Sequence, residues 1–156
     1  MTIIPVIDLA AGQVVHARAG LRADYQPLTA TLAKDSDPAA VIAALRALYR
    51  FDSIYVADLD AIEGRSNHAG TLERLMQLFP RLEFWLDAGP ATLEIATSLQ
   101  AVRPVIGSEN HDHAGLVAAL GIRPDSVLSL DYRNGTFLGD ERLARGCGQL
   151  AWTSSS

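Results

Sequence analysis

Two aspartates that can exchange protons with a small substrate end apolar, strand-like runs in this sequence. Asp8 ends the run of residues 3–8, and Asp131 ends the run of residues 126–131. A carboxylate that ends a buried parallel strand lies at the carboxyl edge of the sheet, where α/β folds bind ligands. Two such groups can face one pocket and act as acid and base on a substrate. Each Asp can instead cap the turn after its strand, but the matched pair favours a site.

The elements that must position these carboxylates alternate along the chain as strand-like and helix-like segments. We expect strands at residues 3–8, 53–58, 82–87, 104–107 and 126–131, and helices that begin near residues 38, 69, 92 and 112. Short strands that are each followed by a helix predict parallel βαβ units with right-handed crossovers. No Gly-x-Gly-x-x-Gly follows the first strand, so a β/α barrel is favoured over a dinucleotide-binding open sheet.

The number of strands limits how much of a barrel this chain can form. A closed barrel of this type needs eight strands and about 250 residues, whereas the sequence has 156 residues and room for five strands. We therefore expect an α/β chain with about the first five of eight βα units in residues 1–139. Residues 140–156 are expected to form an irregular tail, and residues 18–31, which lack periodicity, a mobile loop over the site.

Composition and net charge limit which partners and which cellular compartment this protein can have. The formal net charge of −5 argues against nucleic acid or an anionic membrane as the main partner. No run approaches the roughly 20 apolar residues that span a bilayer, and the chain enters a strand too early for a signal peptide. The single cysteine, Cys147, cannot form an internal disulfide, which fits a reducing compartment. We expect a cytoplasmic protein, and a phosphorylated metabolite stays compatible because backbone amides can hold phosphate.

Three segments resemble a known family in order and spacing. They are residues 4–9 with Gly12, residues 56–61 with Gly64 and Asn67, and residues 129–131 with Gly135. They resemble the first, second and fifth strands of the histidine-biosynthesis barrel family (HisA and HisF). The resemblance implies a TIM-type barrel and, through the Asp-Leu-Asp segment at 58–60, leans towards the ribotide isomerases. That activity implies an Amadori rearrangement with Asp8 as base and Asp131 as acid, and no metal or organic cofactor.

Further ligand contacts are expected near the strand ends. Asp58 and Asp60 alternate along the second strand, so one can point into the pocket while the other caps a helix or meets solvent, and we expect Asp58 to face the pocket. Asn67 can orient the ligand or cap a helix.

The resemblance implies that the ends of strands three and four hold a phosphate through Gly89, Gly107 and Ser108. The loop of residues 87–91 departs from the family, because Asp87 adds a negative charge, Pro90 removes an amide donor and the usual arginine is missing. A second phosphate site, which the family builds from strands seven and eight, has no residues here.

The altered loop keeps two alternatives open. One is a paralogue that acts on a different small molecule, for instance in one-carbon or other cofactor metabolism. The other is a catalytically inactive half-barrel, which associates with itself to cover its open edges. His111 and His113 flank Asp112 after the fourth strand, a spacing that can bind metal, but loop histidines are more often solvated and no metal site is predicted.

Overall fold

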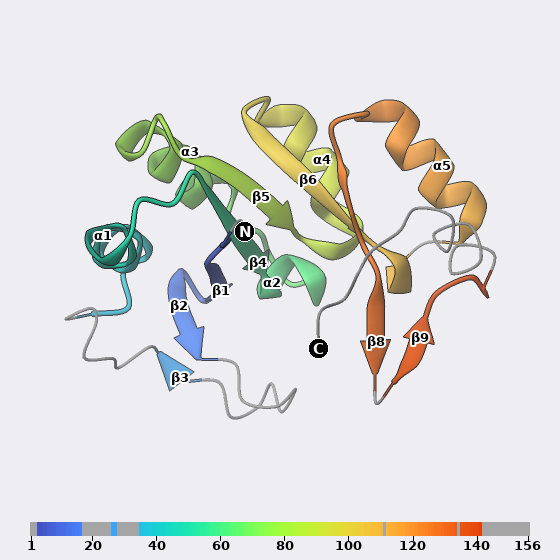
Figure 1. The fold of residues 1–156 in the computed structure, drawn as a ribbon, viewed down its shortest axis with the longest axis horizontal. Helices are drawn as coiled ribbons and strands as arrows, with labels where there is room; N and C mark the ends of the chain where they lie inside the picture. Colours follow the sequence, from blue (N-terminus) through green and yellow to red (C-terminus); the bar gives the residue numbers. More distant parts are fainter. Residues whose placement is uncertain (1–2, 17–25, 28–34, 111, 134, 142–156) are drawn as a thin grey trace.

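A mostly parallel sheet forms the centre of the molecule (Figure 1). The computed structural model describes residues 3–16, 26–27, 35–110, 112–133 and 135–141. Five parallel strands lie side by side in chain order: β1 (Val6–Ala10), β4 (Ser53–Asp58), β5 (Glu83–Asp87), β6 (Val102–Gly107) and β7 (Val127–Ser129). Two short antiparallel strands, β2 (Gln13–His16) and β3 (Gln26–Pro27), extend the sheet beyond β1.

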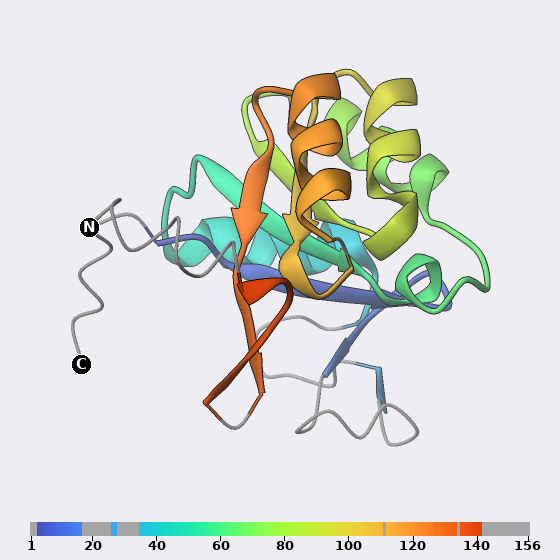
Figure 2. The same ribbon diagram turned by 90° about the vertical axis from the view of Figure 1, so that its right-hand side faces the viewer.

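Helices connect the parallel strands and cover one side of the sheet. They are α1 (Pro38–Leu48), α2 (Leu59–Ile62), α3 (Ala69–Leu78), α4 (Thr92–Ser98) and α5 (His113–Ile122), with short 3₁₀ turns η2 (Gly89–Ala91) and η3 (Ser108–Asn110). Figure 2 shows α3, α4 and α5 standing side by side on that side. A hairpin of β8 (Asp131–Arg133) and β9 (Thr136–Leu138) follows β7.

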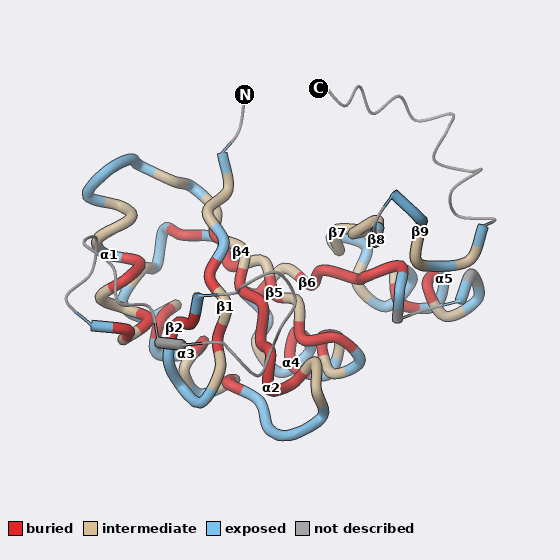
Figure 3. Tube along the Cα trace, turned by 90° about the horizontal axis from the view of Figure 1, so that it is seen from below, coloured by how far each residue is buried: buried red, intermediate tan, exposed pale blue. Residues whose placement is uncertain are grey.

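The two faces of the sheet have different surroundings. Side chains on the helix-covered face form the core, and the largest of them are at most 3% exposed: Ile7, Leu9, Ile54, Val56, Phe84 and Leu86. On the opposite face Asp8, Tyr55, Trp85 and Asp87 are half-buried, and Val6 is 60% exposed. Figure 3 shows the buried stretches gathered along β1, β4, β5 and β6. We call this partly exposed face the open face. A ligand that binds at the strand ends from this side would contact its side chains.

Local sequence signals explain where the first helix begins. Asp37 is the N-cap residue of α1, and its Oδ1 accepts hydrogen bonds from the amides of Ala39 and Ala40 at 2.9 and 3.1 Å. Pro38 occupies the first helical position, where its missing N–H costs nothing. This start matches the prediction from the Asp-Pro pair.

The sequence placed the parallel strands well and their ends less well. The second strand begins and ends where expected, and the fourth begins two residues earlier, at Val102. The expected fifth strand ends at Ser129, and Asp131 instead opens the β8–β9 hairpin, in which Arg133 pairs with Thr136. The helix expected to begin near residue 112 is α5, which ends at Ile122. The four-residue helix α2 was not expected.

Some expectations fall outside the described residues: most of the loop at 18–31, the tail from residue 142 with Cys147, and His111. Within the described part of the chain, no helix combines the length and the hydropathy needed to cross a membrane.

Candidate functional site

Two carboxylates share one row of the open face near the carboxyl ends of the strands. Asp8 of β1 is in register with Ala57 of β4, and Ala57 is in register with Asp87 of β5. Neighbouring strands are about 4.8 Å apart, so the Cα atoms of Asp8 and Asp87 are separated by roughly 10 Å. Because residues in register on parallel strands point to the same side, both carboxylates face the same space. Ala57, which lies between them, is buried in an apolar cluster with Val15 and Leu59.

Tyr55 lies two residues before Ala57 on β4, so its side chain is on the same face as this row. Its phenol donates a hydrogen bond to Oδ2 of Asp87 at 2.8 Å. Burial raises the pKa of Tyr55 far above its ordinary 10, and the negative charges of Asp87, Asp131 and Asp8 raise it further. The phenol stays protonated at any physiological pH.

Asp131 is held by contacts from β7 and from η3, the 3₁₀ turn that follows β6. Its Oδ1 accepts a hydrogen bond from the Ser129 hydroxyl at 3.0 Å, and its Oδ2 accepts one from the Glu109 amide at 3.3 Å. Its own backbone N–H donates to Oγ of Ser108 at 2.9 Å. Ser108 is fully buried and donates in turn to the carbonyl oxygen of Leu138 at 2.7 Å. These contacts fix the Asp131 carboxylate at the edge where β6 and β7 end.

Asp8 is half-buried in the middle of β1. Burial raises the pKa of its carboxyl group above the ordinary 3.8, and the nearby His16 offsets part of that rise. A raised pKa makes the carboxylate a stronger base and brings its titration closer to neutral pH. This is the property that a proton-abstracting group needs.

The structure places Asp58 away from the open face, so the expectation that it faces the pocket is wrong. The residue is 0% exposed, and its Oδ1 caps α2 by accepting from the Ala61 amide at 3.1 Å. The expectation assumed that Asp58 and Asp60 alternate along one strand. The strand ends at Asp58 and a helix starts at Leu59, so helical geometry brings both carboxylates to one side.

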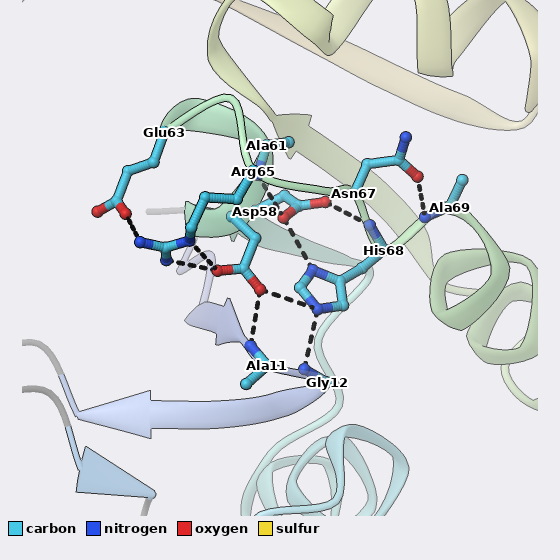
Figure 4. A network of polar contacts seen from close by, with 10 residues as sticks. Ala11, Gly12, Asp58, Ala61, Glu63, Arg65, Asn67, His68 and Ala69 are labelled. Carbon is cyan, nitrogen blue, oxygen red and sulfur yellow. Dashed lines mark hydrogen bonds and ion pairs between the residues drawn. The ribbon is translucent and has the colours of Figure 1, made fainter.

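Both carboxylates meet His68, as Figure 4 shows. Nδ1 of His68 lies 2.8 Å from Oδ1 of Asp58, and Nε2 lies 3.5 Å from Oδ2 of Asp60. The Asp58 carboxylate raises the pKa of His68 above its ordinary 6.5, against the effect of burial. Asp60 is bound in turn by Arg65, which holds the pKa of that carboxyl below its ordinary range.

This network clamps the turn between β1 and β2. The Ala11 amide donates to Oδ2 of Asp60 at 2.8 Å, and the Gly12 amide donates to Nε2 of His68 at 2.9 Å. Ala11 and Gly12 have positive φ values of 49° and 76°, as a tight two-residue hairpin turn requires. The clamp therefore stabilises a strained turn only three residues beyond Asp8.

The residues expected to bind phosphate all have other contacts. The exposed Asn67 accepts a hydrogen bond from the Ala69 amide at 3.1 Å, as a helix-capping side chain does. The Gly89 amide donates to Oδ1 of Asp87 at 3.0 Å, and Gly107 is buried in the β6–β7 pairing. Ser108 positions Asp131, as described above.

Metal binding finds no support in the part of the chain that the structure describes. Among those residues, no group of three or more His, Cys, Asp or Glu side chains could hold an ion. His111 and the side chain of His113, for which no metal site was predicted, are not among them.

Sequence reasoning missed Tyr55 and His68. Tyr55 stands two residues before Ala57, the residue in register with Asp8, and period-two counting from that row would have put it on the open face. His68 left no signal of this kind, because it meets Asp58 only after the chain has passed through α2 and the following loop.

Comparison with known proteins agrees with this arrangement. The family model described as histidine biosynthesis protein matches residues 2–152. A relative in Methanocaldococcus jannaschii, called uncharacterized protein MJ0703, is 30% identical over 145 residues, which cover 88% of this chain and 59% of that protein. The chain thus spans less than two thirds of that relative's length. With five parallel strands in chain order and helices between them, the chain belongs to the histidine biosynthesis protein family of TIM-type (βα) barrels and represents part of such a barrel.

Proposed function

We propose that this chain carries the acid–base centre of an aldose–ketose isomerase of the ribotide type. Its substrate is a sugar phosphate bound at the carboxyl ends of the strands, like the aminoimidazole-carboxamide ribotide that the family resemblance implies. The observation that carries the proposal is the position of Asp8 and Asp131 at the same end of the parallel strands. These residues are 123 positions apart in the sequence, yet Asp8 shares a row with Asp87, the last residue of β5, and Asp131 is held where β6 and β7 end.

The reaction needs one acid and one base. Asp131, as the acid, gives a proton to the ring oxygen of the ribose, which opens the ring to a protonated imine at C1. Asp8, as the base, then removes the proton from C2 to give an enolamine. Asp8 returns this proton to C1, and the C2 hydroxyl loses its proton to Asp131, which yields the aminoketose and restores both carboxyl groups. The isomerisation consumes no oxidant or reductant, because the substrate and product have the same composition. Positioned acids and bases each contribute typically 10²–10⁴-fold, an order-of-magnitude range.

The surroundings of Asp8 suit the role of a base. Burial raises the pKa of its carboxyl group, which makes the carboxylate a stronger base than an ordinary exposed one. Asp131 is held by two hydroxyl-bearing side chains and the Glu109 amide, so its carboxyl group has a fixed direction. Preorganisation of this kind lowers the cost of reaching the transition state.

A second candidate function is favoured by the loop after β5. Asp87 occupies the place where the family resemblance implies a glycine-rich phosphate loop, and its carboxylate is turned to the open face by Tyr55. This observation favours a paralogue in which the same acid–base pair acts on a different small molecule. The two candidates share Asp8 and Asp131 and differ in the ligand.

Turnover of the aminoaldose ribotide by the purified chain tests the proposal. We expect the Asp8→Asn variant to lose more than about 100-fold in kcat, because the amide cannot accept the C2 proton. Asp52→Asn is the matched control, since Asp52 is an exposed aspartate at the opposite, amino-terminal end of β4. It should turn over at the rate of the unmodified protein.

Two outcomes count against the proposal. The ribotide activity is refuted for this chain if the unmodified protein shows no turnover at high enzyme concentration. The assignment of the base is refuted if Asp8→Asn and Asp52→Asn have equal rates.

A further inference from the structure

The loop after β5 has no free amide at the positions where a phosphate would need one. The Ala88 amide donates to Oγ1 of Thr92 at 2.7 Å, and the Gly89 amide donates to Oδ1 of Asp87 at 3.0 Å. The Ala91 amide donates to the Ala88 carbonyl oxygen at 3.2 Å, and Pro90 has no N–H. Loops that hold phosphate do so with several unpaired N–H groups that point at its oxygens. Here each amide of residues 88–91 already has a partner.

The negative charge on the open face also disfavours a phosphate at the end of β5. Asp8 and Asp87 share one row of this face, and Asp131 acts on the same phenol. In β1, β4, β5 and β6 the only basic residue is Arg103. Its guanidinium stacks over the ring of Trp85 and donates to the Asp125 carbonyl oxygen at 2.8 Å. A dianionic phosphate at the end of β5 would meet Asp87 without a neighbouring cation from these strands.

The Tyr55 phenol decides where the Asp87 carboxylate points. It donates to Oδ2 at 2.8 Å, while Oδ1 accepts from the Gly89 amide. Both oxygens are thus fixed, and Asp87 cannot turn away to make room for an anion without losing these contacts. Each carboxylate oxygen has a further lone pair. The group therefore remains able to accept hydrogen bonds from a ligand.

We propose that Tyr55 and Asp87 are specificity-determining residues of the site, which exclude phosphate from the end of β5 and accept a hydroxyl or amino group of the substrate there. This inference rests on the proposed function for the place where the substrate lies. The preferred substrates are then sugar phosphates that present an uncharged or cationic hydrogen-bond donor to β5, and the bisphosphorylated ribotide binds more weakly than a substrate without a phosphate at that end.

Two variants of Asp87 separate the effect of its negative charge on phosphate binding from the effect of its hydrogen bond to the Gly89 amide. Asp87→Asn is nearly isosteric, removes the charge and keeps an oxygen that can accept from Gly89. Asp87→Gly removes the charge and also frees the Gly89 amide. Titration with inorganic phosphate is followed through the amide resonances of Ala88, Gly89 and Ala91 in the full chain.

The expected order of phosphate affinity is Asp87→Gly, then Asp87→Asn, then the unmodified protein. Removal of one unit charge next to the anion should tighten binding by at least about fivefold in Asp87→Asn. Tyr55→Phe keeps the charge but releases Oδ2 of Asp87, so it should tighten phosphate binding, though less than Asp87→Asn does. Equal phosphate-induced shifts at Gly89 in the unmodified protein and in both Asp87 variants would overturn the proposal. If Asp87→Gly does not fold, the isosteric Asn variant alone decides.

A second measurement tests whether Asp87 accepts a hydroxyl group of the ligand in place of a phosphate. In the Asp8→Asn background, which binds without turning over, calorimetry compares the bisphosphorylated ribotide with an analogue that has a hydroxyl in place of the phosphate at the β5 end. We expect the hydroxyl analogue to bind at least about fivefold more tightly, and Asp87→Gly to reverse the order. Tighter binding of the bisphosphorylated ligand with Asp87 present contradicts the proposal.

The two proposals fail in different ways. Loss of the acid–base role appears as unchanged turnover in Asp8→Asn. Loss of the specificity role appears in the phosphate titration, which needs no turnover at all.

Discussion

At the scale of single residues, the molecule uses carboxylates for two different tasks. Asp8 and Asp87 lie in one row on the open face, and Asp131 is held where β6 and β7 end. Asp58 and Asp60 are buried and serve the turn between β1 and β2. The same residue type thus builds a candidate site on one face and a structural clamp behind it.

The clamp predicts a pH-dependent contribution of His68 to stability. The pKa of His68 is raised in the folded protein from the ordinary 6.5, chiefly by Asp58. A raised folded pKa means that the stabilisation is fully present below about pH 6.5 and is lost as pH rises through the folded pKa. We expect the loss in unfolding free energy caused by His68→Gln to be larger at about pH 5.5 than at about pH 8.5 in urea titrations.

Asp58→Asn provides the control, because without the carboxylate the pH dependence of the His68 contribution should shrink. The opposite trend, a His68 contribution that grows with pH, would show that the Gly12 amide controls the ring instead. That amide donates to Nε2 and so favours the neutral imidazole.

At the scale of elements, the cap of α1 can be separated from the ion pair beside it. Asp37 accepts from two helix amides with Oδ1 and binds Arg74 with Oδ2 at 2.7 Å. Loss of an N-cap costs about 1 kcal/mol, whereas an exposed ion pair contributes roughly 0–1 kcal/mol. We expect Asp37→Ala to lower the unfolding free energy by about 1 kcal/mol and Arg74→Ala to lower it clearly less. Equal losses in chemical denaturation would assign the stabilisation to the ion pair.

The sequence determined elements better than it determined side-chain partners. Asp37-Pro38 located a helix start, and the β-branched run at 53–58 gave β4 its observed ends. Both signals are local. The role of Asp58 could not be predicted, because it depends on a helix of only four residues and on His68, ten positions later. The Tyr55–Asp87 contact joins two strands 32 positions apart, and only their register reveals it.

At the scale of the whole molecule, the open face and the sheet edges remain uncovered in the described part of the chain. β3 and β7 are the edge strands of the main sheet, and Val6 is 60% exposed on the open face. Exposed strand edges and apolar patches favour pairing with another chain. We therefore expect concentration-dependent self-association by light scattering.

Two exposed valines make a matched test of that expectation. Val6 lies on the open face and is 60% exposed, and Val117 lies in α5 and is 57% exposed. Val6→Lys should weaken self-association, and Val117→Lys should leave it unchanged. A monomer at every concentration, or equal effects of both variants, would contradict a partner on the open face.

The central claim is that Asp8 and Asp131 serve one reaction in one space. Turnover of the ribotide by Asp8→Asn, Asp131→Asn and the double variant tests it most directly. Residues that act as a unit are strongly non-additive, so each single variant should lose more than about 100-fold and the double variant little more than either. Independent, multiplying losses, or an Asp131→Asn variant as fast as the unmodified protein, would contradict the claim.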